Sequence, residues 1–215
     1  MIAARSLFRE VKNTLPDDKH LGEFVRLQIA FANCLRMTLR RETNADQLSR
    51  YLAPDDLRKV MDANSPANRI LLFMGEWLAV RRRSGHLSDI LFHSLNNRLN
   101  DMSIVLAGCE RIANTPVPFA YTLILHRTVY LFCIMLPFAL VVDLHYMTPF
   151  VSALISYTFI SLDTLAEELE DPFGTEDNDL PLDAICNMME RDLLQMNDEE
   201  NIPERLMPDK HYQLT

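Results

Sequence analysis

The sequence predicts an all-α fold: a helical membrane protein in which a transmembrane helical hairpin continues into a cytosolic helical bundle. Three observations lead to this prediction. Glycine is scarce, with 5 among 215 residues, and no segment sustains the alternation that is typical of a strand. Apolar residues recur at helical spacing through the first half of the chain. Two consecutive segments nearly free of charge then follow, each close to the roughly 20 residues that cross a bilayer.

The chain divides into three predicted regions. Residues 1–115 form a cytosolic helical region, residues 116–163 form the transmembrane hairpin, and residues 164–215 form an acidic cytosolic helix and a tail. The first 115 residues carry 17 Lys+Arg against 13 Asp+Glu, whereas the remaining residues carry 4 against 17. Because this acidic half would repel phosphate, nucleic acid is not expected as a partner.

The four cysteines lie far apart in the sequence and form no CxxC pair. They are Cys34, Cys109, Cys133 and Cys186. This spacing argues against a zinc site and against a disulfide framework, and it suits a reducing cytoplasm. Residues 1–15 mix charge with apolar residues at helical spacing, so they lack the apolar core of a signal peptide.

Two helices are predicted early in the chain. In residues 20–42 the large apolar side chains fall broadly on one helical face, and most of the arginines fall elsewhere. Pro54, followed by Asp55 and Asp56, opens a short helix, because acids in the first turn are stabilised by the helix macrodipole.

Two longer helices follow on either side of Gly85, which breaks the chain. Ser65 and Pro66 supply an N-cap and a first helical position for a helix that runs to Arg83. The second helix covers about residues 88–113. Six of its apolar residues are predicted to point inward: Ile90, Leu91, Leu95, Leu99, Met102 and Leu106.

The run Arg81-Arg82-Arg83 at the end of the first of these helices has two interpretations. Three cations at a helix C-terminus complement its dipole as a solvated helix end. The same three cations suit an anchor for phosphate or for lipid headgroups. The triplet alone does not separate the two.

The helical periodicity disappears after Thr115. Phe119–Val142 supplies one candidate membrane span, and Met147–Leu162, extended to either side, supplies a second. Asp143–Tyr146 is the expected tight turn at the far membrane surface. Four tyrosines are placed to mark the depth of the interfaces: Tyr121, Tyr130, Tyr146 and Tyr157.

The alternative is a buried helical hairpin in a soluble all-α interaction module without transport activity. Two features weigh against it. Most helices of a soluble domain need a wet face, which these segments lack. Pro137 also lies in the middle of the first segment, where neighbouring helices of a membrane bundle accommodate a kink.

His126 and Arg127 place charge inside the first span. Such residues either line a pore or cavity, or lie near one end of the span and extend their polar groups to the interface. A metal site with Asp143 and His145 is excluded, because a helix separates residues 126 and 143 by about 25 Å.

Enzyme motifs are absent from the sequence. It contains no GxSxG, HExxH, GxGxxG or Walker loop. Glu167, Glu168 and Glu170 resemble paired carboxylates, but no base, nucleophile or glycine loop accompanies them. We therefore expect no enzyme activity, no cofactor and no resident metal.

Three short motifs carry a resemblance to a known family. Residues 115–122 read TPVPFAYT, residues 130–132 read YLF, and residues 168–174 read ELEDPFG before further acids. They resemble the bestrophin family, most closely its bacterial inner-membrane members. Family members share a hydrophobic residue and a proline before Tyr-Thr, and an (N/D)-P-F-G followed by an acidic run. The similarity covers nearly all of the chain, most sharply residues 111–196.

The resemblance implies a homopentameric ion channel with one central pore in the bacterial inner membrane, a multi-pass protein with a large cytoplasmic portion. Its expected partners are membrane lipid, small inorganic ions and further copies of the chain. Val117, beside Pro118, matches the position of a cytosolic constriction, where a ring of apolar side chains gates or selects by size. The alternative is that Val117 only packs beside Pro118.

The chain also departs from the family pattern. Family members begin with two further membrane segments, the second of which supplies the apolar neck of the pore. This sequence begins after the point where that segment should end. The resemblance therefore implies an N-terminally truncated subunit that carries the hairpin and most of the cytosolic helices.

The acidic block after the hairpin has two interpretations. In animal bestrophins the corresponding run contributes to a calcium clasp, and Glu176, Asp177 and Asp179 match it loosely. The spacing fails the EF-hand pattern, and the N-terminal part of the clasp is missing. We expect instead a solvated electronegative rim, with a turn at Pro172-Phe173-Gly174 and a further helix over Asp183–Met196. The rim residues are Glu167, Glu168, Glu170, Asp171, Glu176, Asp177 and Asp179.

Ion selectivity is left open by the sequence. Animal members of the family pass chloride, whereas the bacterial branch is expected to pass cations, and the acidic second half favours cations. Charges at a distance are screened within roughly 8–10 Å in salt. Residues 197–215 are predicted to form a tail that wraps neighbouring subunits and is otherwise disordered.

Overall fold

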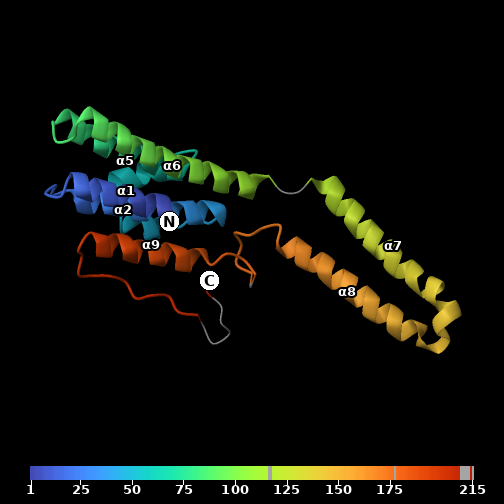
Figure 1. Ribbon diagram of the computed structural model, residues 1–215. Helices are drawn as coiled ribbons and strands as arrows, with labels where there is room; N and C mark the ends of the chain where they lie inside the picture. Colours follow the sequence, from blue (N-terminus) through green and yellow to red (C-terminus); the bar gives the residue numbers. More distant parts are fainter. Residues whose placement is uncertain (116–117, 177, 209–213, 215) are drawn as a thin grey trace. The chain divides into compact units, whose positions relative to one another are not determined.

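The computed structural model describes residues 1–115, 118–176, 178–208 and 214. Within these residues the secondary structure is helical throughout, which confirms the predicted class (Figure 1). The α-helices are α1 (Ile2–Thr14), α2 (Leu21–Leu39), α3 (Ala45–Ser49), α4 (Pro54–Met61), α5 (Pro66–Arg83), α6 (Asp89–Asn114), α7 (Phe119–Leu144), α8 (Thr148–Glu168) and α9 (Leu182–Met196). A short 3-10 helix, His145–Met147, joins α7 to α8.

The chain folds as two compact units. The first, called the bundle below, consists of Met1–Ile112 and Pro181–Thr215. The second, the hairpin unit, is Ala113–Leu180. Because α9 folds with α1–α6, the bundle is built from two stretches of chain that the hairpin unit separates. The predicted region of residues 164–215 is therefore shared between the two units, and the assignment of residues 116–163 to lipid stays a prediction.

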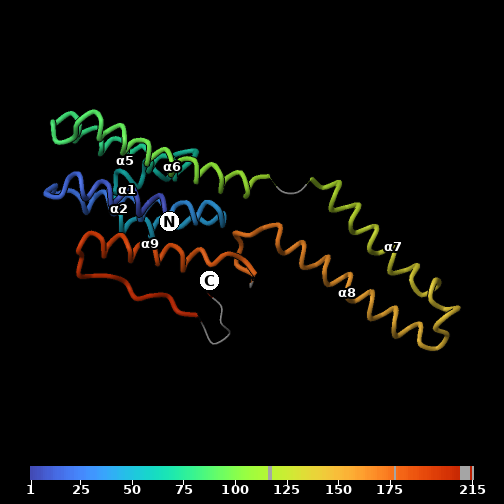
Figure 2. Tube along the Cα trace, viewed as in Figure 1, coloured from blue at the N-terminus to red at the C-terminus, as the bar shows by residue number. Residues whose placement is uncertain are grey.

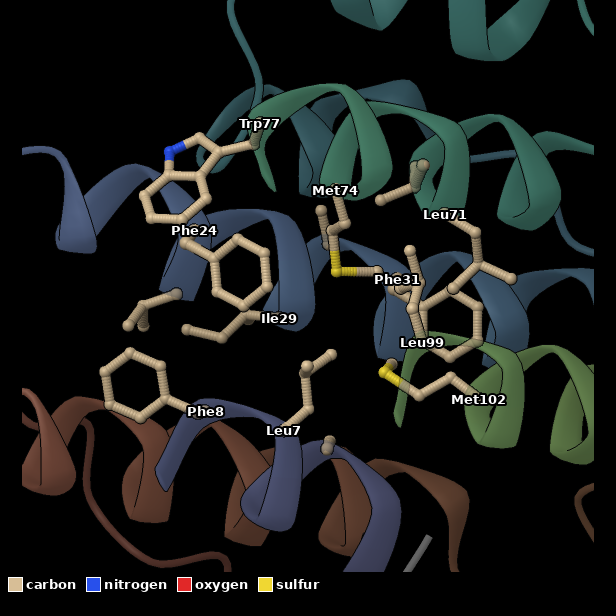
Figure 3. Close-up of a cluster of buried hydrophobic side chains, with 14 of the residues drawn as sticks. Leu7, Phe8, Phe24, Ile29, Phe31, Leu71, Met74, Trp77, Leu99 and Met102 are labelled. Carbon is tan, nitrogen blue, oxygen red and sulfur yellow. The ribbon is translucent and has the colours of Figure 1, made fainter. Parts of the chain in front are cut away.

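The bundle packs around α2. This helix contacts α5, α9, α3 and α1, and the helices run alongside one another in the trace (Figures 1 and 2). The rings of Phe24 (α2) and Trp77 (α5) are tilted against each other with centroids 4.7 Å apart, and Leu7 and Phe8 of α1 approach from the opposite side (Figure 3). Each such side chain contributes about 1.5–3 kcal/mol when it is fully buried, so this core stabilises the bundle.

Helix boundaries in the bundle follow the predicted signals. Pro54 and Pro66 each take the first position of their helix. Gly85 adopts φ +79°, a conformation that favours glycine, as α5 ends. Ser65 is the N-cap residue of α5, as predicted, although its side chain forms no capping hydrogen bond and donates instead to Glu110.

Helix α6 buries a narrower stripe than predicted. Leu95, Leu99, Met102 and Leu106 are buried, with Leu99 against Gly75 of α5, in agreement with the prediction. Ile90 and Leu91, however, are 83% and 41% exposed, so their inward placement was wrong. Ile90 lies about 140° around the helix from Leu95, and both exposed residues belong to the first turn, where few neighbours reach.

The Arg81-Arg82-Arg83 run is engaged within the bundle. Arg81 stacks 3.6 Å over the Trp77 ring and donates to Asp18 at 2.8 Å. Arg82 pairs with Asp89 at 2.7 Å, and Arg83 donates to a carbonyl of its own helix. These contacts favour the helix-end interpretation over a headgroup anchor.

Helix α9 joins the bundle through charge as well as apolar contact. Asp183, in its first turn, pairs with Arg36 and Arg40 of α2, whose side chains are only 8% and 6% exposed. The chain after α9 then runs back along it, where Arg191 donates to the Pro203 carbonyl. Asn187 holds the same segment through Glu204 and Leu206. The part of the tail up to residue 208 is therefore ordered against its own helix, where the prediction expected disorder.

The hairpin unit pairs α7 with α8 along their length. Phe132 and Phe159 meet edge to face with centroids 5.0 Å apart. Near the turn, the Thr148 hydroxyl donates to the Leu140 carbonyl at 3.4 Å. His145 takes φ +45° at the end of α7, within the predicted turn segment. Pro137 lies inside α7, as expected.

The acidic segment after α8 forms a compact turn. The Leu180 amide donates to the Pro172 carbonyl at 3.0 Å, and the Phe173 side chain is buried. The Asp179 carboxylate accepts the Glu176 amide at 2.7 Å. A Cβ on Gly174 would lie 2.5 Å from that carboxylate, so a larger residue there would displace the Asp179 side chain from its bond to the Glu176 amide. The predicted turn at Pro172-Phe173-Gly174 is confirmed.

Candidate functional site

The hairpin presents an apolar surface along both of its helices. Large hydrophobic side chains that would normally be buried are exposed on this surface. They are distributed over several faces of each helix instead of forming one stripe. The most exposed are Phe119, Tyr121, Ile124, Leu131, Ile134, Phe138, Val142, Tyr146, Met147, Phe150 and Tyr157. Exposed apolar area of this extent marks a surface that another apolar medium covers.

This surface has the length and composition of a membrane segment. Among the described residues, one helical stretch is long and apolar enough to cross a bilayer, Phe119–Glu168, and none of its most apolar window is buried. The soluble alternative required a sheath of hydrophilic helices over these segments. The described part of the chain provides no such sheath.

A polar cluster lies near the open end of the hairpin, away from its turn. His126 of α7 faces two carboxylates of α8: Nδ1 lies 2.6 Å from Asp163 Oδ2, and Nε2 lies 2.8 Å from Glu167 Oε1. Tyr130, one turn further along α7, stacks at 6.5 Å from the imidazole. Asp163 and Glu167 are four residues apart and therefore share one face of α8. The side chains are 26% (His126), 14% (Asp163) and 54% (Glu167) exposed.

His126 and Arg127 are not brought together by the structure. The imidazole points to α8, whereas Arg127 is exposed and has no ion pair or hydrogen bond within the described ranges. The prediction that both line a pore or cavity stays a prediction. Asp163 was not singled out from the sequence. Its signal was its place as a carboxylate on the face of Glu167, but its partner lies 37 residues away.

The predicted constriction is described only in part. Pro118 is exposed and precedes α7 with φ −56° and ψ 126°. Val117 lies outside the described residues, so the ring that it was predicted to form stays a prediction.

The acidic rim residues have different surroundings. Glu168 accepts a hydrogen bond from Asn178 at 2.7 Å, while Glu170 and Asp171 are exposed at the end of α8. Glu176 is exposed, and Asp179 is committed to the turn. Asp177 lies outside the described residues. No group of three His, Cys, Asp or Glu side chains suited to a metal was found within the described residues.

Comparison with known proteins identifies the family. The profile of the family described as "Bacterial/Fungal Bestrophin protein" matches residues 1–195. The chain belongs to the bestrophin family. This confirms the resemblance that the TPVPFAYT and DPFG motifs carried.

Several bestrophins are closely similar over the whole chain. A Salmonella typhimurium protein named "Voltage-dependent anion channel-forming protein YneE" is 78% identical over 215 residues, which are all of this chain and 71% of the relative. The protein of the same name from Escherichia coli K12 is 77% identical over the same shares. These relatives are named for channel formation, which agrees with the prediction that the chain is not an enzyme.

Solved bestrophin structures share the fold. The crystal structure of a bacterial bestrophin homologue from Klebsiella pneumoniae matches with a TM-score of 0.88 at 52% identity, covering 93% of this chain and 75% of that one. A crystal structure described as a membrane protein matches with a TM-score of 0.89 at 51% identity, over the same shares. The all-α fold of a bestrophin membrane protein is therefore confirmed.

Proposed function

We propose that this chain is a subunit of a bestrophin-like channel that conducts small ions across the bacterial inner membrane. The observation that carries the proposal is the uncovered apolar hairpin of a chain that belongs to the bestrophin family. The names of the relatives, which describe channel-forming proteins, support it.

The proposal assigns a place to each part of the chain. The α7–α8 hairpin lies in lipid through about residues 119–162, and the bundle lies in the cytoplasm. A homopentamer places Val117, next to Pro118, as a ring at a constriction of the conduit. Such a ring makes an ion shed water or wait until the pore wets, so it restricts flux by size.

Two observations bear on the ion that is conducted. The relatives are named for anions, whereas the acidic residues after α8 raise the local concentration of cations. A reversal potential measured across a KCl gradient decides between them, because its sign follows the more permeant ion.

The proposal is tested first by membrane fractionation and then by flux. Expressed in bacteria, the chain should stay in the membrane pellet after alkaline carbonate, and the purified protein in lipid vesicles should release trapped salt. Release of the chain into the carbonate supernatant would refute its placement in lipid. Crosslinking in detergent should yield a series that ends at five copies.

A charge on the lipid-facing surface of the hairpin should block its insertion. Phe138 is exposed in the second half of α7, within the predicted span, and a lysine there costs up to about 2.5–3.5 kcal/mol on insertion. Phe138→Lys should lower the carbonate-resistant fraction roughly tenfold or more. Leu72→Lys serves as the matched control, since Leu72 is an exposed apolar residue of the bundle, and it should leave that fraction unchanged. An equal fraction for both variants contradicts the placement.

A further inference from the structure

The strongest polar contact between α7 and α8 is the cluster of His126, Asp163 and Glu167. Both ring nitrogens of one imidazole lie within hydrogen-bond distance of a carboxylate oxygen, at 2.6 and 2.8 Å. The three side chains belong to the same folded unit, and the contact joins helices that are otherwise held mainly by apolar packing. The cluster is the polar connection at the open end of the hairpin.

The number of protons on the imidazole decides how many of these contacts are favourable. A carboxylate is an acceptor only, so each ring nitrogen must carry hydrogen to bond to it. Neutral imidazole carries one N–H and therefore serves one carboxylate, while its other nitrogen turns a lone pair toward the second. Imidazolium carries two N–H groups and serves both. With both carboxylates ionised, the two contacts are therefore favourable together only when the ring is protonated.

The surroundings make the unprotonated state costly. The Asp163 side chain is only 14% exposed on a helix whose neighbouring surface is apolar. An ionised carboxylate in such surroundings needs a compensating cation. Within the described hairpin unit, the ionisable groups around the ring are the two carboxylates from α8, with Tyr130 and Arg127 on α7 itself. Arg127 is exposed and forms no ion pair with either carboxylate within the described residues, so the imidazolium is the cation for both.

We infer that His126 is a positioning residue. When protonated, it bonds to both Asp163 and Glu167 and holds α7 and α8 together at the open end of the hairpin, an arrangement called the clamp below. When neutral, it releases one of the two carboxylates. The net charge of the cluster changes from −1 to −2 on release, and the two carboxylates, one helical turn apart, then repel each other. The ends of α7 and α8 at the open end of the hairpin therefore separate as pH rises through the range in which histidine titrates.

This inference rests on the proposed function for its consequence in the channel. If the hairpin lies in the membrane, the clamp couples proton concentration to the spacing of two membrane helices, and conduction should depend on pH. The clamp itself is a property of the folded hairpin unit and can be measured without ion flux.

Hydrogen–deuterium exchange of the full chain in lipid nanodiscs tests the clamp. Exchange is compared at about pH 5.5 and about pH 8.0, with labelling times scaled for the intrinsic exchange rate. In the wild type, protection of peptides covering residues 119–130 and 160–170 should fall roughly two- to fivefold at the higher pH, as expected for loss of a partly exposed charge-assisted hydrogen bond.

Three variants separate this mechanism from a purely structural role. His126→Gln has no titrating proton, so its protection should not depend on pH. His126→Arg keeps a cation at every pH and should remain protected at both values, which also covers a failure of the glutamine variant to fold. His145→Gln, at the turn of the same hairpin, should behave like the wild type.

Two outcomes would overturn the inference: protection in the wild type that does not depend on pH, or a dependence that persists in both His126 variants. Salt release from vesicles is measured in parallel. If the chain fails to conduct but shows the exchange pattern, the clamp is supported and the channel function is refuted. If the chain conducts without the exchange pattern, the channel function is supported and the clamp is refuted.

Discussion

At the scale of single residues, burial controls the chemistry of the cysteines. Cys34 and Cys186 lie inside the bundle, and the Cys186 thiol donates to the Ala32 carbonyl. Burial raises the pKa of Cys34 to about 12 and the pKa of Cys186 to about 11. Because the thiolate is the reactive form, both should be inert at neutral pH.

Thiol labelling checks this expectation. With a maleimide at about pH 7.5, Cys34 and Cys186 should react at least a hundredfold more slowly in the folded chain than after denaturation, because less than about one thiol in a thousand is ionised and access is blocked. Peptide mass spectrometry assigns the labelled residues. Rapid labelling of either cysteine in the folded state would show that the bundle opens there.

The contacts of individual side chains were also the feature that the sequence predicted least completely. The contact of His126 with Asp163 depends on the register of two helices across a turn, and no local pattern encodes that register. Ser65 is the N-cap residue of α5, but its hydroxyl donates to Glu110 of α6 and accepts no backbone N–H of its own helix. Where a side chain has more than one partner within reach, tertiary packing decides which contact forms, and local propensity contains no information on that packing.

At the scale of elements, proline and glycine were sufficient to place the starts of α4 and α5 and the end of α5. Pro54, Pro66 and Gly85 act within a few residues of backbone, so their effect can be read directly from the sequence. The exposed start of α6 could not be read in this way. Ile90 is apolar like its buried neighbours, and only the position of other helices determines that it has no contact there.

Docking of α9 provides a prediction at this scale. Asp183→Ala removes the carboxylate that Arg36 and Arg40 share and leaves Arg36, within the described residues, only its 3.6 Å ion pair with Glu42, which should cost about 2–4 kcal/mol of unfolding free energy. Denaturant unfolding followed by the fluorescence of Trp77, the only tryptophan, measures this loss.

Asp55→Ala is the matched control for this measurement. It removes an exposed pair with Arg58 at 2.8 Å, which contributes little in water. If the two variants are equally stable, then the buried arginines do not depend on α9.

At the scale of the whole molecule, carboxylates with depressed pKa values join distant parts of the bundle. Hydrogen bonding from Arg81 lowers the pKa of Asp18, and hydrogen bonding from Ser94, with that from Arg98, lowers the pKa of Glu10. Each group then contributes stability that is present above its unfolded pKa, near 3.8 for Asp18 and 4.5 for Glu10. That stability is lost as pH falls through the folded pKa.

Thermal unfolding as a function of pH tests this linkage. Near neutral pH, Asp18→Asn should lower the Tm of the bundle by about 2–6 °C, and the difference from wild type should vanish as pH falls below about 4. Asp17→Asn, at the exposed neighbouring position, should change neither the Tm near neutral pH nor its dependence on pH. A difference that stays constant down to acid pH would exclude ionisation of Asp18 as the cause.

The division of the bundle into two stretches of chain also determines the order of events during synthesis. When the first 112 residues have left the ribosome, Arg36 and Arg40 are still without Asp183, which follows 68 residues of hairpin unit. Because α9 follows the hairpin unit in the chain, the core of the bundle is completed only after the whole hairpin has been synthesised. Under the proposed function, the apolar hairpin is therefore ready to enter the bilayer while the bundle is still unfinished.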